Sequence, residues 1–134
     1  MVETKVTVKD ETARLKAKAK AANIRSLGKV AAYVRTTARR LIRRQGKKGK
    51  PSSPGQPPKT KAGKMKDAIL FSVNEFKDEA IVGVAKSRFG EAGKAHEHGG
   101  KFRGADYPKR PTMGPALEKS TDILPSFWQS SLRN

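Results

Sequence analysis

Residues 46–63 constrain the fold more than any other part of the sequence. This stretch of 18 residues contains four glycines and four prolines among basic and hydroxyl side chains. Because proline lacks a backbone N–H and glycine is conformationally permissive, the stretch is predicted to be an extended loop without regular structure. The loop separates a basic helical region, residues 1–45, from a β-rich core at 64–113 and a C-terminal helix with an aromatic tail at 114–134, all within a single domain.

The region before the loop predicts one long helix over residues 10–45, or two helices bent near Gly28. Asp10 is a suitable N-cap, and the arginine-rich last turns suit the negative end of the helix dipole. Apolar residues recur at three- and four-residue steps and form one packing stripe, which comprises Leu27, Val30, Ala31, Val34, Ala38, Leu41 and Ile42. A column of Arg35, Arg39 and Arg43 follows another face and is expected to stay available to a partner.

Positive charge is concentrated in the first half of the chain. The net charge is +18; residues 1–69 hold 20 Lys and Arg against 4 Asp and Glu, whereas residues 70–134 hold 10 against 8. A basic half predicts an anionic partner, which is nucleic acid, an acidic protein surface or an anionic membrane, and the alternative is a merely solvated surface. The candidate partner-facing residues are Arg35, Arg39, Arg40, Arg43, Arg44, Lys47, Lys48 and Lys50. A membrane is disfavoured because the basic helix has no Trp or Phe on its apolar face.

The region after the loop predicts a β-hairpin. Residues 69–76 and 78–86 have strand composition, and the polar stretch 74–78 between them suits a turn. A short turn or helix is expected at 64–68, a polar loop at 87–93, one helical turn at 94–98, and an irregular segment or short strand at 102–110. The predicted fold class is α+β, with a long N-terminal helix and a C-terminal helix packed on a small antiparallel sheet.

The last part of the chain predicts a short helix followed by an aromatic tail. Gly114-Pro115 opens the helix, since proline is favoured in a first helical turn, and Pro125 is expected to kink or end it. Phe127, Trp128 and Leu132 form a tail that either returns to the core or docks on a neighbouring protein.

Residue types that support catalysis are missing or wrongly spaced. The sequence has no cysteine, so it has neither a disulfide nor a thiol nucleophile. His96, Glu97 and His98 are adjacent, whereas a zinc protease needs two histidines four residues apart, so they are interpreted as a polar turn without a metal. No phosphate-binding glycine loop or G-x-S-x-G motif occurs, so neither a cofactor nor an enzymatic activity is expected. The sequence also lacks a spanning apolar run and the apolar core of a signal peptide, which predicts a cytoplasm-like compartment.

Five short segments occur in a characteristic order. They are GQPP at 55–58, AGKMKDAI at 62–69, AIVGV at 80–84, AHEHGG at 95–100 and YPKRPTMGPAL at 107–117. This series resembles the minor tail component family of tailed bacteriophages, also called tail-completion, neck or head-tail joining proteins. Ala62, Met65, Ala68 and His98 stand where the family commonly has Thr, Leu, Ser and Phe.

The resemblance implies an α+β structural virion protein that is present in the neck or at the top of the tail and is made in the host cytoplasm. Its partners would be further copies in a ring, six or twelve by symmetry, the adjacent neck proteins, the tail terminator or tube, and the DNA in the channel. Pro54, Gly55, Pro57 and Pro58 would form an inter-subunit loop. The motif residues with an expected structural role are Gly63, Gly83, His96, Glu97, Gly99, Arg110, Pro111 and Pro115. The alternative function is a freestanding, non-specific nucleic-acid-binding protein that uses the basic helix.

Overall fold

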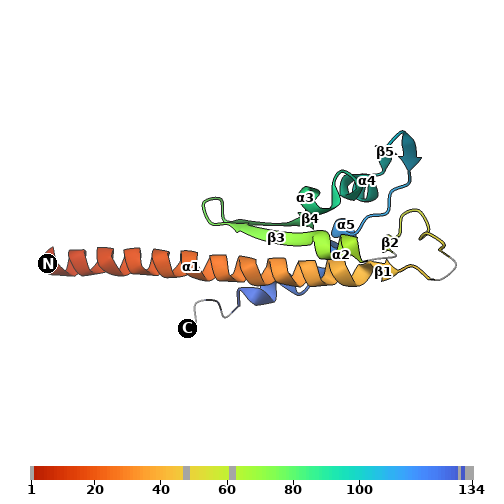
Figure 1. Ribbon diagram of the computed structural model, residues 1–134. Coiled ribbons are helices and arrows are strands. Elements are labelled where there is room, and N and C mark those ends of the chain that lie inside the picture. The colour runs from red at the N-terminus through yellow and green to blue at the C-terminus, as the bar shows by residue number, and fades with distance from the viewer. Residues whose placement is uncertain (1, 47–48, 61–62, 130, 132–134) are drawn as a thin grey trace.

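A single long helix and a two-stranded hairpin beside it dominate the computed structural model of the protein (Figure 1), which describes residues 2–46, 49–60, 63–129 and 131. In chain order the elements are α1 (Val2–Leu41), β1 (Arg43–Arg44), β2 (Lys59–Thr60), α2 (Lys64–Ala68), β3 (Ile69–Asn74), β4 (Glu79–Val84), α3 (Lys86–Phe89), α4 (Ala92–His98), β5 (Gly100–Phe102), β6 (Ala105–Tyr107), α5 (Met113–Ser120) and the 3₁₀ helix η1 (Leu124–Phe127). The predicted α+β class is confirmed.

Helix α1 is longer and straighter than the sequence predicted. It spans 40 residues, which is about 60 Å at the usual rise per residue, and it begins well before Asp10. The predicted cap at Asp10 was therefore wrong, because once a helix is nucleated each further residue adds at little cost. Of the two alternatives, one long helix or two helices bent near Gly28, the structure shows the single helix, since α1 continues through Gly28. The helix ends at Leu41, before Gln45, because Arg43 and Arg44 pair with β2 instead.

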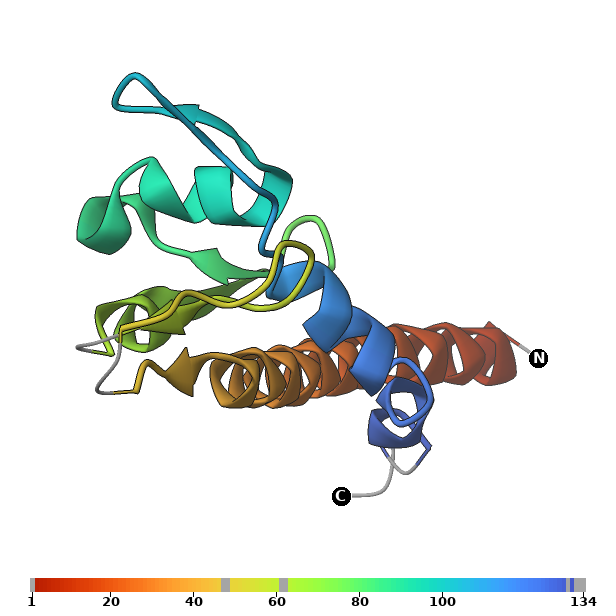
Figure 2. The ribbon, with the colours of Figure 1, turned by 90° about the vertical axis from the view of Figure 1, so that its right-hand side faces the viewer.

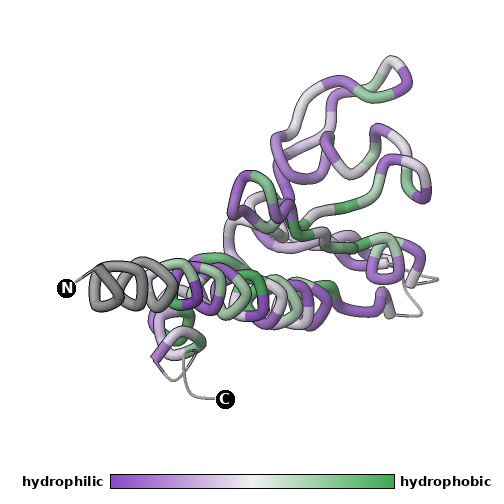
Figure 3. The backbone as a smooth tube through the Cα atoms, turned by 90° about the vertical axis from the view of Figure 1, so that its left-hand side faces the viewer, coloured by the Kyte–Doolittle hydropathy of each residue, from purple (hydrophilic) through white to green (hydrophobic). Residues whose placement is uncertain are grey.

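The core forms where the apolar stripe of α1 meets β3, α2 and α5. Its buried members are Val34, Ala38, Ile42, Met65, Ile69 and Ala116. In Figure 3 the apolar stretches of α1 and β3 lie beside one another, whereas the outlying loops are mostly hydrophilic. The stripe predicted on α1 is thus the face that packs, with Leu27, Val30 and Leu41 half-buried at its margins.

Strands β3 and β4 form the predicted antiparallel hairpin. Ile69 pairs with Val84 at one end and Asn74 with Glu79 at the other. The Asn74 side chain closes the turn by accepting hydrogen bonds from the backbone amides of Phe76 and Lys77, at 3.0 and 3.2 Å. Since side chains alternate along a strand, one face of this hairpin packs on α1 and the other faces outward.

The glycine- and proline-rich segment returns to its starting point instead of remaining without regular structure. Strand β2 pairs in parallel with β1, with Arg43 opposite Lys59 and Arg44 opposite Thr60. The Gln45 amide adds a hydrogen bond of 2.9 Å to the carbonyl of Thr60. The prediction of a loop without any regular element was wrong at residues 59–60, because pairing satisfies backbone groups that would otherwise lack partners.

The polar loop predicted at residues 87–93 was also wrong. Helix α3 occupies residues 86–89, and α4 starts at Ala92, before the predicted helical turn at 94–98. A Cβ at Gly93 would lie 2.9 Å from Cγ1 of Val84, so glycine lets α4 approach the end of β4 closely. Strands β5 and β6 follow as a second small antiparallel hairpin, at the end of the molecule farthest from α1 in Figure 2.

The C-terminal segment folds back onto α1. Helix α5 ends at Ser120, and Pro125 lies in the first turn of η1, where it is tolerated, instead of breaking α5. Beyond it, Ser26 Oγ donates to the carbonyl of Phe127 at 3.0 Å, and Trp128 Nε1 donates to Asn23 Oδ1 at 2.9 Å. Of the two alternatives for the aromatic tail, the described part therefore returns to its own chain; Leu132 lies outside the described residues.

Candidate assembly and nucleic-acid interface

The Glu97 carboxylate holds the start of α5. Its Oε2 accepts the backbone amides of Thr112 and Met113 at 2.8 and 3.0 Å, and its Oε1 accepts that of Gly114 at 2.9 Å. Burial acts to raise the pKa of Glu97, but the three amides, with the nearby His98, outweigh burial and hold this pKa below its ordinary value. A carboxylate at a helix N-terminus also interacts favourably with the helix dipole. Glu97 is therefore an ionised cap that joins α4 to α5.

Arg110 ties the 46–63 segment to the same region. Its Nε donates to the carbonyl of Ser52 at 2.9 Å, and its backbone amide donates to the carbonyl of His96 at 2.7 Å. The Gly55 amide donates to the carbonyl of Lys109, also at 2.7 Å. Burial lowers the pKa of His96, and the charge of Arg110 lowers it further, which favours a neutral imidazole. Segments near residues 55, 97 and 110, far apart in sequence, thus form one hydrogen-bonded node.

The glycines and prolines of the motif series have different roles. Gly63 has φ +68° and precedes α2, and Gly99 has φ +73°, where a Cβ would lie 3.2 Å from the backbone nitrogen of Lys109. Gly83 has no positive φ and no atom within 4 Å of a Cβ, so the expected tight backbone position is absent there. Pro115 lies in the first turn of α5, as expected, and Pro111 immediately precedes that helix.

The predicted inter-subunit loop is only partly exposed. Pro54 and Gly55 are exposed and Pro57 is half-buried, so these residues remain open to a neighbour. Pro58 is fully buried within the chain and cannot contact another subunit. This part of the prediction was wrong because the segment packs back against the body of the protein.

The arginine column predicted on α1 does not exist as a free surface. Arg35 is half-buried, and its Nε donates to the carbonyl of Ile69 at 2.6 Å, so it ties α1 to β3. Arg39 lies 3.6 Å from Asp67 in an ion pair. Arg43 lies beyond the end of α1, in β1. The periodicity placed Arg35 and Arg39 on one face of α1, but it could not reveal that β3 and α2 contact that face, or that the helix ends before Arg43.

The other basic candidates are exposed around the end of α1. Arg40, Arg43, Arg44 and Lys50 have exposed side chains, whereas Lys47 and Lys48 lie outside the described residues. Within the part of the chain that the structure describes, none of the four exposed residues has a carboxylate partner. These charges remain available for an anionic partner.

Sequence reasoning missed an apolar surface on the outer side of the hairpin. Leu70 and Ile81 lie on the face opposite to the core residue Ile69, and they are 36% and 60% exposed. Phe76, in the turn, is 96% exposed, and Phe71, which shares the face of Ile69, is 41% exposed beside the core. The signal was present, because continuous apolar runs such as 69–71 and 80–82 are typical of strands covered on both faces.

The first half of α1 projects away from the rest of the protein. In Figure 1 it extends well past the tip of the hairpin, and residues 12–21 are all exposed. Few apolar side chains lie in this projecting part, Leu15 being one of them. The basic arm expected from the alternation of Lys and Ala is thus an exposed helix.

Neither a metal site nor a membrane-spanning helix is found among the described residues. No group of three or more His, Asp or Glu side chains is gathered there as a metal ion would require, His96 and His98 included. None of the described helices is long and apolar enough to cross a membrane.

Comparison with known proteins found no matching protein-family model, curated protein or solved structure.

Proposed function

We propose that this chain is a structural protein of a tailed bacteriophage virion that forms a ring in the neck or at the top of the tail, where it completes the tail and joins it to the head. The observation that carries the proposal is the apolar outer face of the hairpin, with Leu70 and Ile81 exposed. The ordered motif series described above supplies the family to which that assembly would belong. The role needs no catalytic residue.

An apolar face of this kind supports assembly. Monomeric proteins tolerate single exposed apolar side chains, but contiguous apolar patches commonly mark contact surfaces. The projecting half of α1 extends past the tip of β3–β4 (Figure 1), so the outer face of the hairpin and the projecting helix are two different surfaces of the subunit. A contact between two different surfaces of identical subunits is heterologous, and such contacts produce a closed ring when the rotation between subunits closes.

The projecting helix supports the same interpretation. Isolated helices gain little stability in water, and most helices in proteins are stabilised by tertiary packing. Residues 13–21 are all exposed, so the described part of the subunit gives them little of this packing. In a ring, this half of α1 would lie against the next subunit or against an adjacent neck protein, which would supply the missing contacts.

The charge distribution fits a position on the DNA channel. DNA passes through the lumen of a neck ring, and the exposed arginines Arg40, Arg43 and Arg44 would interact with its phosphates or with acidic surfaces of adjacent rings. Non-specific contacts of this type suit a channel, because the DNA must move through it.

Assembly can be tested with the full chain by native mass spectrometry and negative-stain electron microscopy. We expect closed rings, six or twelve copies each, and we expect Ile81→Lys to abolish them while the secondary structure stays intact. Ile123→Lys is the matched control, because Ile123 is also exposed, at 41%, but lies outside the hairpin. A wild-type protein that stays monomeric at high concentration, or an Ile81→Lys protein that still forms rings, would contradict the proposed assembly.

The alternative is a freestanding nucleic-acid-binding protein, and it is favoured by the exposed arginines Arg40, Arg43 and Arg44, which form no ion pair with any described residue. It predicts that the isolated monomer coats duplex DNA with an affinity that falls steeply with salt concentration, since each neutralised phosphate releases counterions. A monomer that binds DNA in this way and forms no ring would favour this alternative.

A further inference from the structure

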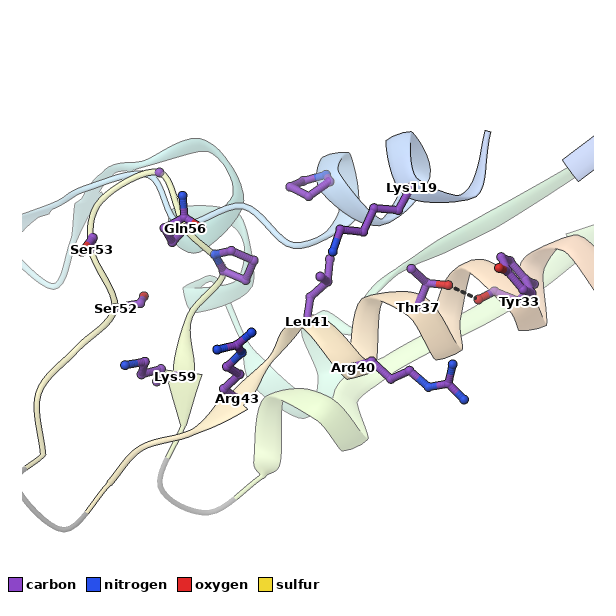
Figure 4. A pocket seen from close by; sticks show the side chains of 13 residues that line it. Tyr33, Thr37, Arg40, Leu41, Arg43, Ser52, Ser53, Gln56, Lys59 and Lys119 are labelled. Atoms are coloured by element: carbon purple, nitrogen blue, oxygen red, sulfur yellow. Dashed lines mark hydrogen bonds between the residues drawn. The ribbon is translucent and has the colours of Figure 1, made fainter. Parts of the chain in front are cut away.

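An open groove lies between the end of α1, residues 52–57 and helix α5 (Figure 4). Its volume is about 830 Å³, within the usual range of binding sites for small ligands and short peptide segments. The node around Arg110 fixes one wall, because Arg110 holds the carbonyl of Ser52 and Lys109 holds the amide of Gly55. The groove is therefore a preformed feature of the fold.

The lining of the groove is basic. It includes four cationic side chains from four different elements, Arg40, Arg43, Lys59 and Lys119, and no carboxylate. None of the four forms an ion pair with any residue in the described ranges. In Figure 4, Arg43 from β1 and Lys119 from α5 point into the space between α1 and the 52–57 wall, whereas Arg40 points away. The groove thus has two inward positive charges without a counter-charge.

A second feature of the groove is a hydroxyl without a hydrogen-bond partner. Ser52 lines the groove, its side chain is 7% exposed, and no group in the described chain bonds its Oγ. In Figure 4 this hydroxyl lies on the inner side of the 52–57 curve, on the side of Arg43. Buried hydroxyls are nearly always hydrogen-bonded, so an unsatisfied one at a binding wall indicates that an acceptor is missing in the free protein.

The shape and the apolar lining favour a peptide over nucleic acid. Single-stranded nucleic acid binds by stacking its bases on aromatic rings, but Tyr33, the aromatic residue of the lining, already packs on Phe127 with ring centroids 5.6 Å apart. A duplex presents a convex surface that does not enter a groove between a helix and a loop. Leu41, Pro57 and Pro115 add apolar walls suited to side chains of a peptide.

We propose that this groove binds an extended acidic peptide segment of a partner protein. Arg43 and Lys119 would pair with carboxylates of the peptide, Ser52 Oγ would donate a hydrogen bond to it, and Leu41 and Pro57 would contact its apolar side chains. The source of the segment rests on the proposed function, in which the partner is an adjacent neck or tail protein; the chemistry of the groove does not depend on it.

The test is fluorescence anisotropy with the full chain and a fluorescein-labelled ten-residue peptide of alternating glutamate and leucine. We expect saturable binding that weakens by about tenfold or more in the double variant Arg43→Gln, Lys119→Gln, because two charge pairs are lost. The matched control is Arg25→Gln, Lys29→Gln, which removes the same charge from exposed positions of α1 outside the groove, and it should change affinity by less than about twofold.

Ser52→Ala gives a readout that a purely structural role would not produce. Removing an unsatisfied hydroxyl leaves the melting temperature of the free protein unchanged or slightly higher, whereas peptide binding should weaken by about threefold or more. A Ser52→Ala protein that binds the peptide as tightly as the wild type would overturn the proposal. The proposal would also be overturned if the control double variant weakened peptide binding as much as the groove double variant does. Equal weakening would mean that the peptide is attracted by the overall positive charge of the protein.

A ten-residue thymidine oligonucleotide serves as the competing ligand. If it displaces the peptide, and if its own binding depends on Arg43 and Lys119 to the same degree, the groove is a nucleic-acid site and the peptide proposal fails. Ring formation is measured separately on the same variants. Rings that persist without peptide binding would remove only this inference, whereas peptide binding without rings would remove the neck role and keep the groove.

Discussion

Oε2 of Glu97 accepts the backbone amide of Thr112 at 2.8 Å, across fifteen residues of sequence. The bond connects the end of α4 with the start of α5, and the same carboxylate also accepts the amides of Met113 and Gly114. Three donors that a helix start normally leaves without partners are satisfied by one side chain. The position of α5, which supplies Ala116 to the core and Lys119 to the basic groove, therefore depends on the charge of Glu97.

Glu97→Gln should lower the free energy of unfolding by about 1 kcal/mol near neutral pH, because an amide is a weaker acceptor and lacks the favourable charge. The folded-state pKa of Glu97 lies below its ordinary value of 4.5. The contribution of the carboxylate is therefore complete above about pH 4.5 and is lost as the pH falls through the lower folded-state pKa. Urea unfolding at a series of pH values should show the gap between wild type and variant shrinking in acid.

Glu118→Gln provides the control for that series, since Glu118 is exposed on α5 and caps nothing in the described structure. Its unfolding free energy should follow the wild type within about 0.5 kcal/mol at every pH. A difference between Glu97→Gln and wild type that stays constant down to pH 3 would contradict the capping role of the carboxylate.

Asn23→Ala should shift the fluorescence emission of Trp128 to longer wavelength. Trp128 is the single tryptophan, and its indole N–H donates to Asn23 Oδ1 at 2.9 Å. Without that acceptor the end of η1 should separate more often from α1 and expose the indole to water. Asp78→Ala is the control, because it removes the weaker bond of 3.4 Å from Asn23 Nδ2 and leaves the indole contact in place. An equal shift in both variants would be inconsistent with this account.

Arg35→Gln and Arg40→Gln remove the same charge from the same helix, but they should differ in stability. Arg35 donates to the carbonyl of Ile69 from a half-buried position, so Arg35→Gln should lower the free energy of unfolding by about 1 to 2 kcal/mol. Arg40 is exposed, so Arg40→Gln should lower the free energy of unfolding by less than about 0.5 kcal/mol. Thermal unfolding of both variants measures the difference. Equal melting temperatures would mean that Arg35 is a surface residue after all.

Ile42→Val and Ile81→Val delete the same methylene group from opposite environments. Ile42 is 0% exposed in the core, so its loss should cost about 1 kcal/mol, whereas Ile81 is 60% exposed in the monomer and should cost almost nothing. The comparison is made by urea unfolding at low protein concentration, at which the proposed rings would dissociate. If Ile81→Val were as destabilising as Ile42→Val under those conditions, the hairpin would be covered within the subunit.

The amphipathic stripe and the hairpin were predictable because each depends on local pattern. The spacing of Val34, Ala38 and Ile42 determines which face of α1 packs, and Asn74 supplies a turn that its own side chain closes. Fold class followed from these two elements. Glu97 and Arg110, both in the motif series, form hydrogen bonds between distant segments of the chain.

The features that were not predictable depend on contacts between distant segments. Arg35 looked free because nothing in the helix pattern indicates that the carbonyl of Ile69 lies above it. The start of α4 was predicted as loop, since glycine is a poor helix former, whereas Gly93 is required there by the approach to Val84. The basic groove combines Arg43, Ser52 and Lys119, and only the return of residues 52–60 to α1 brings them together.

The most direct test of the central claim is cryo-electron microscopy of the purified virion to which the proposed function assigns this chain. The account predicts a closed ring of this protein between the portal and the tail tube, with the outer face of β3–β4 buried against the next subunit. A virion that lacks this chain, with the protein found only as a monomer that coats DNA, would contradict it.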